Sequence, residues 1–541
     1  MEPRNRIDAI RAGKTALGIE FGSTRIKAVL IDETHRVLAS GHFTWENRLE
    51  NGLWTYRLED AVSGLQQSFA MLAGDVQRQF GVELTTVGSI GISGMMHGYL
   101  ALDAAGKQLF PFLTWRNTNT GAAADALTEL FQFNIPLRWS IAHLYQAILN
   151  HEPHIAKISQ ITTLAGYIHY LLSGERVMGI GEAAGMFPID YDHLDFNEKM
   201  LEQFDDSIAA YGYDWNVRSI LPKVLTAGQC AGRLTEEGAE LLDPSGRLQP
   251  GIPLAPPEGD AATGMVATNS VGIGTGNLSA GTSIFSMVVL EKNLSRYYKD
   301  IDIVSTPSGR PVAMIHCNNG TSELDTWMRM FGEVLESVGV SIPTDRLYSE
   351  LFRKSLQGDS DSDGILLYNY VSGEPVTGLN DGRPLLVRRQ DSKLSLANFM
   401  RAQIYSVIAS LAAGMRILAE EGIQITRLNA HGGLFRTPGV AQRYLAAAMG
   451  SPVTVMQTAG EGGPYGMAVL ALYLWKKGQL PLETYLQETV FHNVDSTTIA
   501  PDAGDAKGFA EYLQAYCDGL QIERCAVSCV KATSGTEGSV T

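Results

Sequence analysis

An aspartate surrounded by small residues is the feature of this sequence with the clearest chemical potential. Asp260 lies in the segment 258–264 (Glu-Gly-Asp-Ala-Ala-Thr-Gly), at a predicted helix start. The small neighbours leave room for a hydroxyl group beside the carboxylate, and such a carboxylate can act as a general base in phosphoryl transfer. Taken alone, the segment is explained at least as well by an N-cap aspartate with no catalytic role.

A tight turn between two apolar segments near the N-terminus is a second candidate. Residues 16–32 predict a strand, a turn and a second strand, because apolar residues flank small turn-forming ones. The turn consists of Gly22, Ser23 and Thr24. Glycine lets the backbone approach a ligand closely, and amide and hydroxyl groups in such a turn can bind phosphate oxygens. Lys27 could reach a terminal phosphate, and Glu20 could hold a metal ion through water. Taken alone, the segment fits an ordinary β-hairpin equally well.

A similar turn recurs in the second half of the chain. Gly281, Thr282 and Ser283 again follow an apolar segment and precede a β-branched and apolar run. Two strand–turn–strand units with small hydroxyl-bearing turns suggest two related lobes. The Pro- and Gly-rich segment 244–258 predicts a boundary between them.

A pair of glycines could border a nucleotide. Gly432 and Gly433 follow His431 and an apolar segment, and they precede a predicted helix at residues 442–449. Glycines at such a position would let a flat adenine ring lie against the backbone.

Two further segments carry side chains that suit a polyhydroxylated ligand. Met96 and His97 end a predicted strand, and Trp115 and Asn117 follow the next one. A neutral histidine, an aromatic ring and an amide can recognise hydroxyl groups and the apolar face of a sugar. A core histidine and a core tryptophan are the alternative interpretation.

Length, charge and cysteine content limit the class of protein. With 541 residues, the chain is too long for one compact core. Its net charge of −16 argues against nucleic acid as the main partner. No apolar stretch approaches the roughly 20 residues of a membrane span, and the N-terminus has no apolar segment of the kind that signals secretion. Five unevenly spaced cysteines favour reduced thiols in the cytoplasm.

Together and in this order, the segments resemble the FGGY family of carbohydrate kinases over about residues 16–478. The turn at residues 22–24 is similar to the first phosphate motif of that family, and the turn at residues 281–283 to the second. Residues 259–264 are similar to the segment with the catalytic aspartate, and residues 432–433 to the adenosine motif. The resemblance implies an α/β fold of two actin/Hsp70-like (ribonuclease H-like) ATPase lobes, with an active-site cleft between them.

The resemblance also implies roles for individual residues, with ATP and Mg²⁺ as cofactors. Asp260 would be the general base and, with Glu20, would hold the metal. The residues implied at the nucleotide are Gly22, Ser23, Thr24, Lys27, Gly281, Thr282, Gly432, Gly433 and Leu434. Those implied at the acceptor substrate are Met96, His97, Trp115, Asn117 and Asp260.

The implied activity is the ATP-dependent phosphorylation of a hydroxyl group on a small sugar or polyol. Residues 96–98 are similar to the sugar-binding segment of xylulokinases, which favours a pentulose such as xylulose or a related ketose or polyol. The chain departs from the family pattern in having Glu20 for an aspartate, Met95 for a glutamine and Asn119 for an arginine. These departures keep open an alternative, a catalytically weak ATP- and sugar-binding sensor of the same fold.

The predicted organisation has four parts. Residues 1–15 form an N-terminal extension, 16–258 a sugar-binding domain, 259–478 a nucleotide-binding domain, and 479–541 a C-terminal helix and flexible tail. The predicted partner is a small sugar or polyol, with no nucleic acid and no membrane. The resemblance further implies a possible homodimer in the cytoplasm.

Overall fold

The computed structural model describes residues 3–456, 462–476 and 479–531, and these residues form two compact units. The first unit contains the described residues within 1–273, 289–312 and 458–494. The second contains those within 274–288, 313–457 and 495–541. The predicted domain boundaries at residues 258 and 478 stay predictions, and residues 532–541 of the predicted flexible tail lie outside the described residues.

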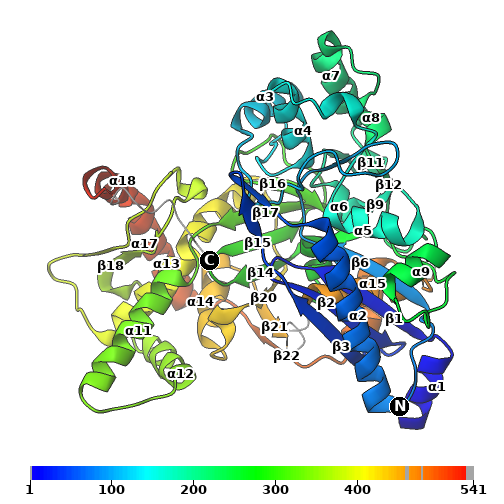
Figure 1. The fold of residues 1–541 in the computed structure, drawn as a ribbon. Helices are drawn as coiled ribbons and strands as arrows, with labels where there is room; N and C mark the ends of the chain where they lie inside the picture. The colour runs from blue at the N-terminus through cyan, green and yellow to red at the C-terminus, as the bar shows by residue number, and fades with distance from the viewer. Residues whose placement is uncertain (1–2, 457–461, 477–478, 532–541) are drawn as a thin grey trace. The chain divides into compact units, whose positions relative to one another are not determined.

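The first unit is built on a five-stranded sheet with the order β13-β6-β1-β2-β3. Four of these strands, β1, β2, β3 and β6, are labelled in Figure 1. The strands are β1 (Thr15–Phe21), β2 (Arg25–Asp32), β3 (Val37–Thr44), β6 (Ser89–Gly94) and β13 (Glu258–Gly259). Strands β1, β6 and β13 run parallel to one another, whereas β2 is antiparallel to both β1 and β3. The hairpin predicted from residues 16–32 is confirmed.

Glycines in the strands let two helices pack closely against this sheet. Helix α15 (Gly462–Tyr473) covers β1, where a Cβ at Gly18 would lie 2.1 Å from the carbonyl oxygen of Pro464. Helix α2 (Leu58–Phe80) covers β3, where a Cβ at Gly41 would lie 2.1 Å from the carbonyl oxygen of Ser68. Because no side chain intervenes at these glycines, strand and helix backbones touch directly.

Shorter elements complete the first unit. They are α1 (Pro3–Arg11), β4 (Arg48–Glu50), β5 (Leu53–Thr55), β7 (Leu100–Leu102), α3 (Gly121–Phe131), α4 (Ser140–Leu149), β8 (Gln160–Thr162), α5 (Leu164–Ser173), β9 (Val177–Gly179), α6 (Ile180–Ala183), β10 (Ile189–Asp190), β11 (Asp195–Phe196), α7 (Glu198–Ile208), α8 (Val217–Ile220), β12 (Lys223–Leu225), α9 (Glu236–Leu242), α10 (Asp260–Ala267), β16 (Asp302–Ser305) and α16 (Leu482–Tyr485). Helix α5 ends at Gly174, which adopts the left-handed conformation that favours glycine at a helix C-terminus.

In the second unit, six strands follow one another in a sheet in the order β17-β15-β14-β20-β21-β22. The strands are β14 (Thr275–Ala280), β15 (Ile284–Val289), β17 (Pro311–Cys317), β20 (Arg427–His431), β21 (Val453–Met456) and β22 (Ser496–Ile499). Strand β14 pairs antiparallel with β15 and parallel with β20, and β20 pairs parallel with β21. The order β3-β2-β1-β6-β13 of the first unit is thus repeated as β17-β15-β14-β20-β21. The related lobes predicted from the two hydroxyl-bearing turns are confirmed.

The remaining elements of the second unit are mostly helical. They are α11 (Ser322–Ser337), α12 (Thr344–Ser355), β18 (Ile365–Tyr368), β19 (Leu385–Arg388), α13 (Leu396–Glu420), α14 (Val440–Met449), α17 (Ala503–Asp518) and α18 (Leu520–Cys529). Contrary to the expectation from the sequence, one helix among the described residues, α13, is long and apolar enough to cross a membrane, but most of it is buried inside the protein. It is therefore explained as the core helix of this unit.

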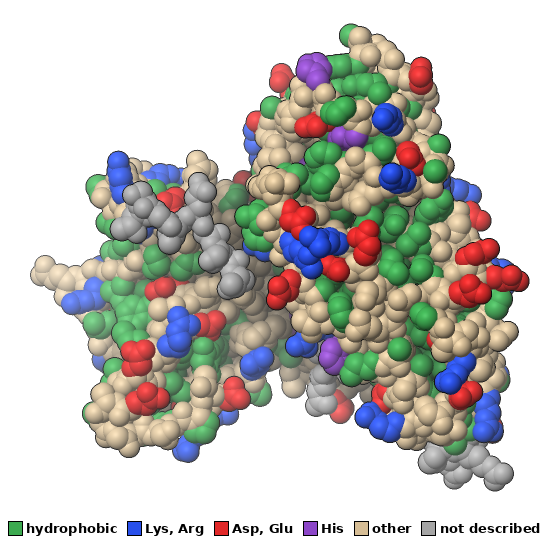
Figure 2. Space-filling model, viewed as in Figure 1, with side chains coloured by type: hydrophobic (Ala, Val, Ile, Leu, Met, Phe, Trp, Pro, Cys, Tyr) green, Lys and Arg blue, Asp and Glu red, His purple; other side chains and the backbone are tan. Residues whose placement is uncertain are grey.

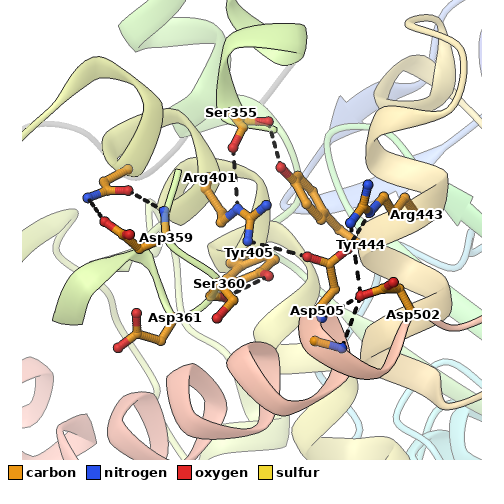
Figure 3. Close-up of polar contacts among 12 residues, drawn as sticks. Ser355, Asp359, Ser360, Asp361, Arg401, Tyr405, Arg443, Tyr444, Asp502 and Asp505 are labelled. Carbon is orange, nitrogen blue, oxygen red and sulfur yellow. Dashed lines mark hydrogen bonds and ion pairs between the residues drawn. The ribbon is translucent and has the colours of Figure 1, made fainter. Parts of the chain in front are cut away.

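A buried ion pair attaches the C-terminal helix α17 to the rest of the second unit (Figure 3). Arg401 of α13 lies 3.4 Å from the carboxylate of Asp505 on α17, and both side chains are almost completely buried. Arg443 of α14 reaches the other carboxylate oxygen of Asp505. Asp502 caps α17 by accepting hydrogen bonds from its first-turn amides. Helix α17 is therefore an integral part of this unit.

Charged side chains of both signs are intermixed on the face of the molecule seen in Figure 2. The face in view has no broad basic surface of the kind that binds a nucleic acid backbone. None of the five cysteines forms a disulfide, as predicted.

Candidate active site

In the first unit, three parallel strands end at one edge of the sheet. Glu20 of β1 and Glu258 of β13 both pair with Ser93 of β6. Because the three strands run in the same direction and in register, the residues that follow them begin side by side. Asp260 and Met96, which are far apart in the sequence, meet at this edge.

Asp260 is the first residue of helix α10, and its carboxylate oxygen Oδ1 accepts a hydrogen bond of 3.1 Å from the backbone amide of Met96. The N-cap position itself belongs to Gly259, which lies before it. The side chain is partly buried, and burial raises the pKa of its carboxyl group, opposed by the hydrogen bond from Met96. A carboxylate with a raised pKa is a better proton acceptor than one in water.

Glu20 stands beside Asp260 and opposite Lys27. It pairs with Lys27 across the β1–β2 hairpin, and its carboxylate lies so close to α15 that a Cβ at Gly463 would be 1.5 Å from Oε2. Burial, reinforced by repulsion from Asp260 and opposed by Lys27, raises the pKa of Glu20 to about 7.

Glu20 and Asp260 fit the predicted magnesium site, because two neighbouring carboxylates that repel each other gain from a divalent cation. No group of three or more His, Cys, Asp or Glu side chains is arranged for a metal in the part of the chain that the structure describes. Mg²⁺ binds through one or two carboxylates plus water and phosphate oxygens, so two carboxylates suffice.

Two buried glutamates, Glu182 and Glu258, lie behind Asp260 and were given no role in the sequence analysis. The carboxylate of Glu258 accepts a hydrogen bond of 2.9 Å from the amide of Glu182, and burial raises its pKa to about 8. Glu182 is completely buried, which raises its own pKa well above the ordinary value. Glycines make room for both groups, since a Cβ at Gly181 would lie 2.4 Å from Glu258 and one at Gly259 would lie 2.3 Å from Glu182. A glutamate within a glycine-rich segment is the signal that sequence reasoning could have used.

His97 is buried directly beyond the end of β6. Its backbone has φ of +73°, which turns the chain sharply, and its Nδ1 lies 3.4 Å from the carbonyl oxygen of Gly185. A Cβ at Gly185 would lie 2.6 Å from this nitrogen, so only glycine fits there. Burial holds the pKa of His97 well below its usual range, so the ring is neutral, as predicted for a hydrogen-bonding partner of hydroxyl groups.

Trp115 and Asn117 have different surroundings. Trp115 is 42% exposed and is free to contact a ligand. Asn117 is buried, and its amide oxygen accepts a hydrogen bond of 2.9 Å from the amide of Trp54. Its amide nitrogen donates to the carbonyl oxygens of Trp54 and Thr114 at 2.8 Å and 3.1 Å. The side chain of Asn117 is thus bonded to backbone on both sides.

In the second unit, the two remaining predicted segments also meet at neighbouring strand ends. Ser279 of β14 pairs with His431 of β20, so the turn at residues 281–283 lies next to residues 432–434. Gly432 has φ of +108°, and a Cβ there would lie 2.3 Å from the carbonyl oxygen of Ala280. Space around the Cβ positions of Gly281 and Gly433 is open, whereas Leu434 is buried. This arrangement exposes backbone that could contact a nucleotide.

A polar network that the sequence did not reveal holds this second turn. The amides of Gly320 and Thr321 donate hydrogen bonds of 2.8 Å to the carbonyl oxygens of Thr282 and Gly281. The neighbouring Asn319 is bonded in turn to the buried carboxylate of Glu374. The carbonyl groups of the turn are thereby directed toward the protein.

Comparisons with known proteins agree with these observations. The model of the N-terminal domain of the FGGY family of carbohydrate kinases matches residues 15–267, and that of the C-terminal domain matches residues 276–475. A xylulose kinase from Haemophilus influenzae is 22% identical over 512 residues, which cover 92% of this chain and 98% of the relative. An L-fuculokinase from Escherichia coli K12 is 24% identical over 251 residues, 44% of this chain and 49% of the relative.

Solved structures confirm the predicted fold class of two actin/Hsp70-like α/β domains. The ligand-bound xylulose kinase from Lactobacillus acidophilus superposes with a TM-score of 0.77 at 15% identity, covering 96% of this chain and all of the other. The glycerol kinase from Plasmodium falciparum with ADP gives a TM-score of 0.73 at 15% identity, covering 94% and 98%. At sequence identities this low, the superpositions establish a shared fold alone.

Proposed function

The chain belongs to the FGGY family of carbohydrate kinases and is an ATP-dependent sugar kinase; from that premise we propose that it phosphorylates a hydroxyl group of a pentulose or related ketose or polyol, with Asp260 as the general base. The observation that carries the proposal is the position of the Asp260 carboxylate, which is bonded to the Met96 amide at the strand edge beside His97. There the same carboxylate can meet an acceptor that His97 and Met96 bind.

In the proposed reaction, a lone pair of the acceptor oxygen attacks the γ-phosphorus of ATP. The proton of the acceptor hydroxyl moves to the carboxylate of Asp260, a new O–P bond forms, and the bond between the γ-phosphorus and the β–γ bridging oxygen breaks. The products are a sugar phosphate and ADP. The raised pKa of Asp260 supports this role, because the proton transfer becomes more favourable.

The two hydroxyl-bearing turns would bind the phosphates of ATP. Ser23 and Thr24 are partly or fully exposed after β1, and Lys27 stands one strand away. In the second unit, Thr282 is exposed and Gly433 has open space around it, which supports contact with phosphate and adenosine. Mg²⁺ held by Glu20 and Asp260 would neutralise phosphate charge.

The acceptor is proposed to be a pentulose because several relatives are named xylulose kinases. Neutral His97 would exchange hydrogen bonds with acceptor hydroxyl groups, and the exposed ring of Trp115 could cover an apolar face of the sugar. A location in the cytoplasm, where ATP and reduced thiols coexist, is part of the proposal.

The test measures ADP release from ATP and Mg²⁺ with a panel of pentuloses, pentitols and tetritols, for wild type and Asp260→Asn. Asparagine keeps an oxygen that can accept the Met96 hydrogen bond but cannot take the proton, so kcat should fall about 10²–10⁴-fold. Equal activity of the two proteins would refute Asp260 as the base. ATP and sugar binding without ADP release by wild type would favour the sensor alternative.

A further inference from the structure

The carbonyl oxygens of three consecutive residues in the turn at 22–24 all accept hydrogen bonds from the segment 45–56. The indole Nε1 of Trp45 donates to the carbonyl oxygen of Gly22 at 2.7 Å, and the hydroxyl of Tyr56 donates to that of Ser23 at 2.6 Å. The backbone amide of Trp45 donates to the carbonyl oxygen of Thr24 at 3.2 Å. Segment 45–56 therefore binds every carbonyl group of this turn.

Because each peptide group is planar, the direction of these carbonyl groups also fixes the direction of the amide groups that follow them. In a trans peptide, the N–H group points opposite to the C=O group of the same plane. Carbonyl groups of Gly22 and Ser23 that face segment 45–56 thus direct the amides of Ser23 and Thr24 toward the other side. Neither amide has a hydrogen-bond partner within the described ranges of the chain. Successive free amides that point the same way form an anion-binding concavity.

The two side-chain donors are rigidly held. Trp45 and Tyr56 are 6% and 2% exposed, and their rings stack with centroids 4.2 Å apart. Burial raises the pKa of Tyr56, so the phenol keeps the proton that it donates to Ser23. A buried aromatic pair of this kind has few rotamers and loses little entropy when it makes a hydrogen bond.

Asn117 belongs to the same assembly. Its amide bonds the backbone of Trp54 in both directions, and Trp54 lies in β5, two residues before Tyr56. The guanidinium of Arg116 lies 3.7 Å from the centre of the Trp54 ring. The loop with the exposed Trp115 is thereby joined to the strand that positions Tyr56.

We propose that Trp45 and Tyr56 are positioning residues of the kinase reaction that direct the amides of Ser23 and Thr24 toward the phosphates of ATP, and that Asn117 supports them by fixing β5. The inference rests on the proposed function. It differs from the role expected for Asn117, which was contact with the sugar.

The test variant is Tyr56→Phe, which removes one hydroxyl and keeps the ring stacked on Trp45. Tyr191→Phe is the matched control, because the Tyr191 hydroxyl also donates to a backbone carbonyl oxygen, that of Val304, at 2.8 Å. One lost hydrogen bond corresponds to a change of about 3- to 10-fold in an equilibrium or rate constant. Tyr56→Phe should lower kcat/KM for ATP by this factor and leave the KM for the sugar unchanged.

A direct binding measurement separates positioning from general damage. Calorimetry with the β,γ-imido analogue of ATP should show about 3- to 10-fold weaker binding to Tyr56→Phe than to wild type or Tyr191→Phe. Binding of AMP, which has no β- or γ-phosphate, should be equal in all three proteins. Trp45→Phe, which removes the Nε1 donor, should repeat the pattern.

Equal ATP kinetics and equal analogue binding for Tyr56→Phe and Tyr191→Phe would overturn the inference, as would parallel losses for AMP and the analogue. If wild type phosphorylates no acceptor but binds the analogue, the proposed function fails, while the binding comparison still decides the inference. If wild type binds no analogue, both fail.

Discussion

The backbone amide of Met96 donates a hydrogen bond of 3.1 Å to Oδ1 of Asp260, across 164 positions of the chain. The bond joins the end of β6 to the start of α10, and it orients the carboxylate toward the segment that includes His97. A side chain that serves as an ordinary N-cap would instead accept hydrogen bonds only from its own helix. This geometry supports the proposal that Asp260 is the general base.

Because Gly463 lies close to the carboxylate of Glu20, we expect a side chain at position 463 to lower the activity. In Gly463→Ala the added methyl group would collide with Oε2 of Glu20, which a 1.5 Å separation cannot accommodate, so the carboxylate must move. We expect kcat to fall at least about tenfold, since misplacement of about 1 Å near the chemistry costs up to 10²-fold. Steady-state kinetics of ADP release measure the effect.

Two comparisons control that experiment. Gly74 lies in α2, and the space that a Cβ would occupy there is open. Gly74→Ala should therefore leave activity unchanged and stabilise the protein by up to about 1 kcal/mol. Glu20→Asp in the Gly463→Ala background shortens the colliding side chain and should restore part of kcat. Full activity of Gly463→Ala alone would contradict a role for the Glu20 position.

Glu258 predicts how stability changes toward alkaline pH. Its pKa is about 8 in the folded protein and 4.5 in the unfolded chain, so folding favours the protonated form. The contribution is present below pH 4.5 and is lost as pH rises through 8, by an amount on the order of 5 kcal/mol. The glutamine of the Glu258→Gln variant cannot ionise. The melting temperature of this variant should therefore fall less than that of wild type between pH 5 and pH 8.5. Parallel melting curves across that range would refute the buried, protonated state.

The burial of His143 leads us to expect that stability falls as the pH is lowered into the acid range, the opposite of the effect of Glu258. Burial lowers its pKa from 6.5 to about 4, so between these values the unfolded chain binds a proton that the folded protein does not. Stability should fall as pH drops from 6.5 to 4, by about 3 kcal/mol from this residue. His143→Phe should flatten that limb in chemical unfolding at pH 4.5 and 7. A slope unchanged by the substitution would contradict the prediction.

The Arg401–Asp505 pair predicts a stability effect at the C-terminal helix. Asp505→Asn leaves the guanidinium of Arg401 buried without its counter-charge, which costs about 3–5 kcal/mol. Asp195→Asn removes the exposed partner of Arg218 and should cost less than about 1 kcal/mol. Denaturant unfolding measures both. Similar losses for the two variants would show that burial of the first pair contributes nothing.

Local sequence determined the elements with short-range signals. The hairpin of β1 and β2 and the recurrence of a hydroxyl-bearing turn at residues 281–283 were both predicted correctly. Apolar periodicity and turn chemistry act between neighbours in the chain, so they can be seen without a structure. The order of the motifs was sufficient to predict the family and the fold.

Tertiary structure alone decided what surrounds each functional group. Glu182 and Glu258 are 76 positions apart, yet they meet behind Asp260 because β13 and α6 pack together. The hydrogen bonds of Asn117, Trp45 and Tyr56 to backbone groups were likewise not predicted, because they depend on which backbone groups lie opposite each side chain. Burial, pKa and hydrogen-bond partners are properties of neighbours in space, and long-range packing sets those neighbours without leaving a periodic signal in the chain.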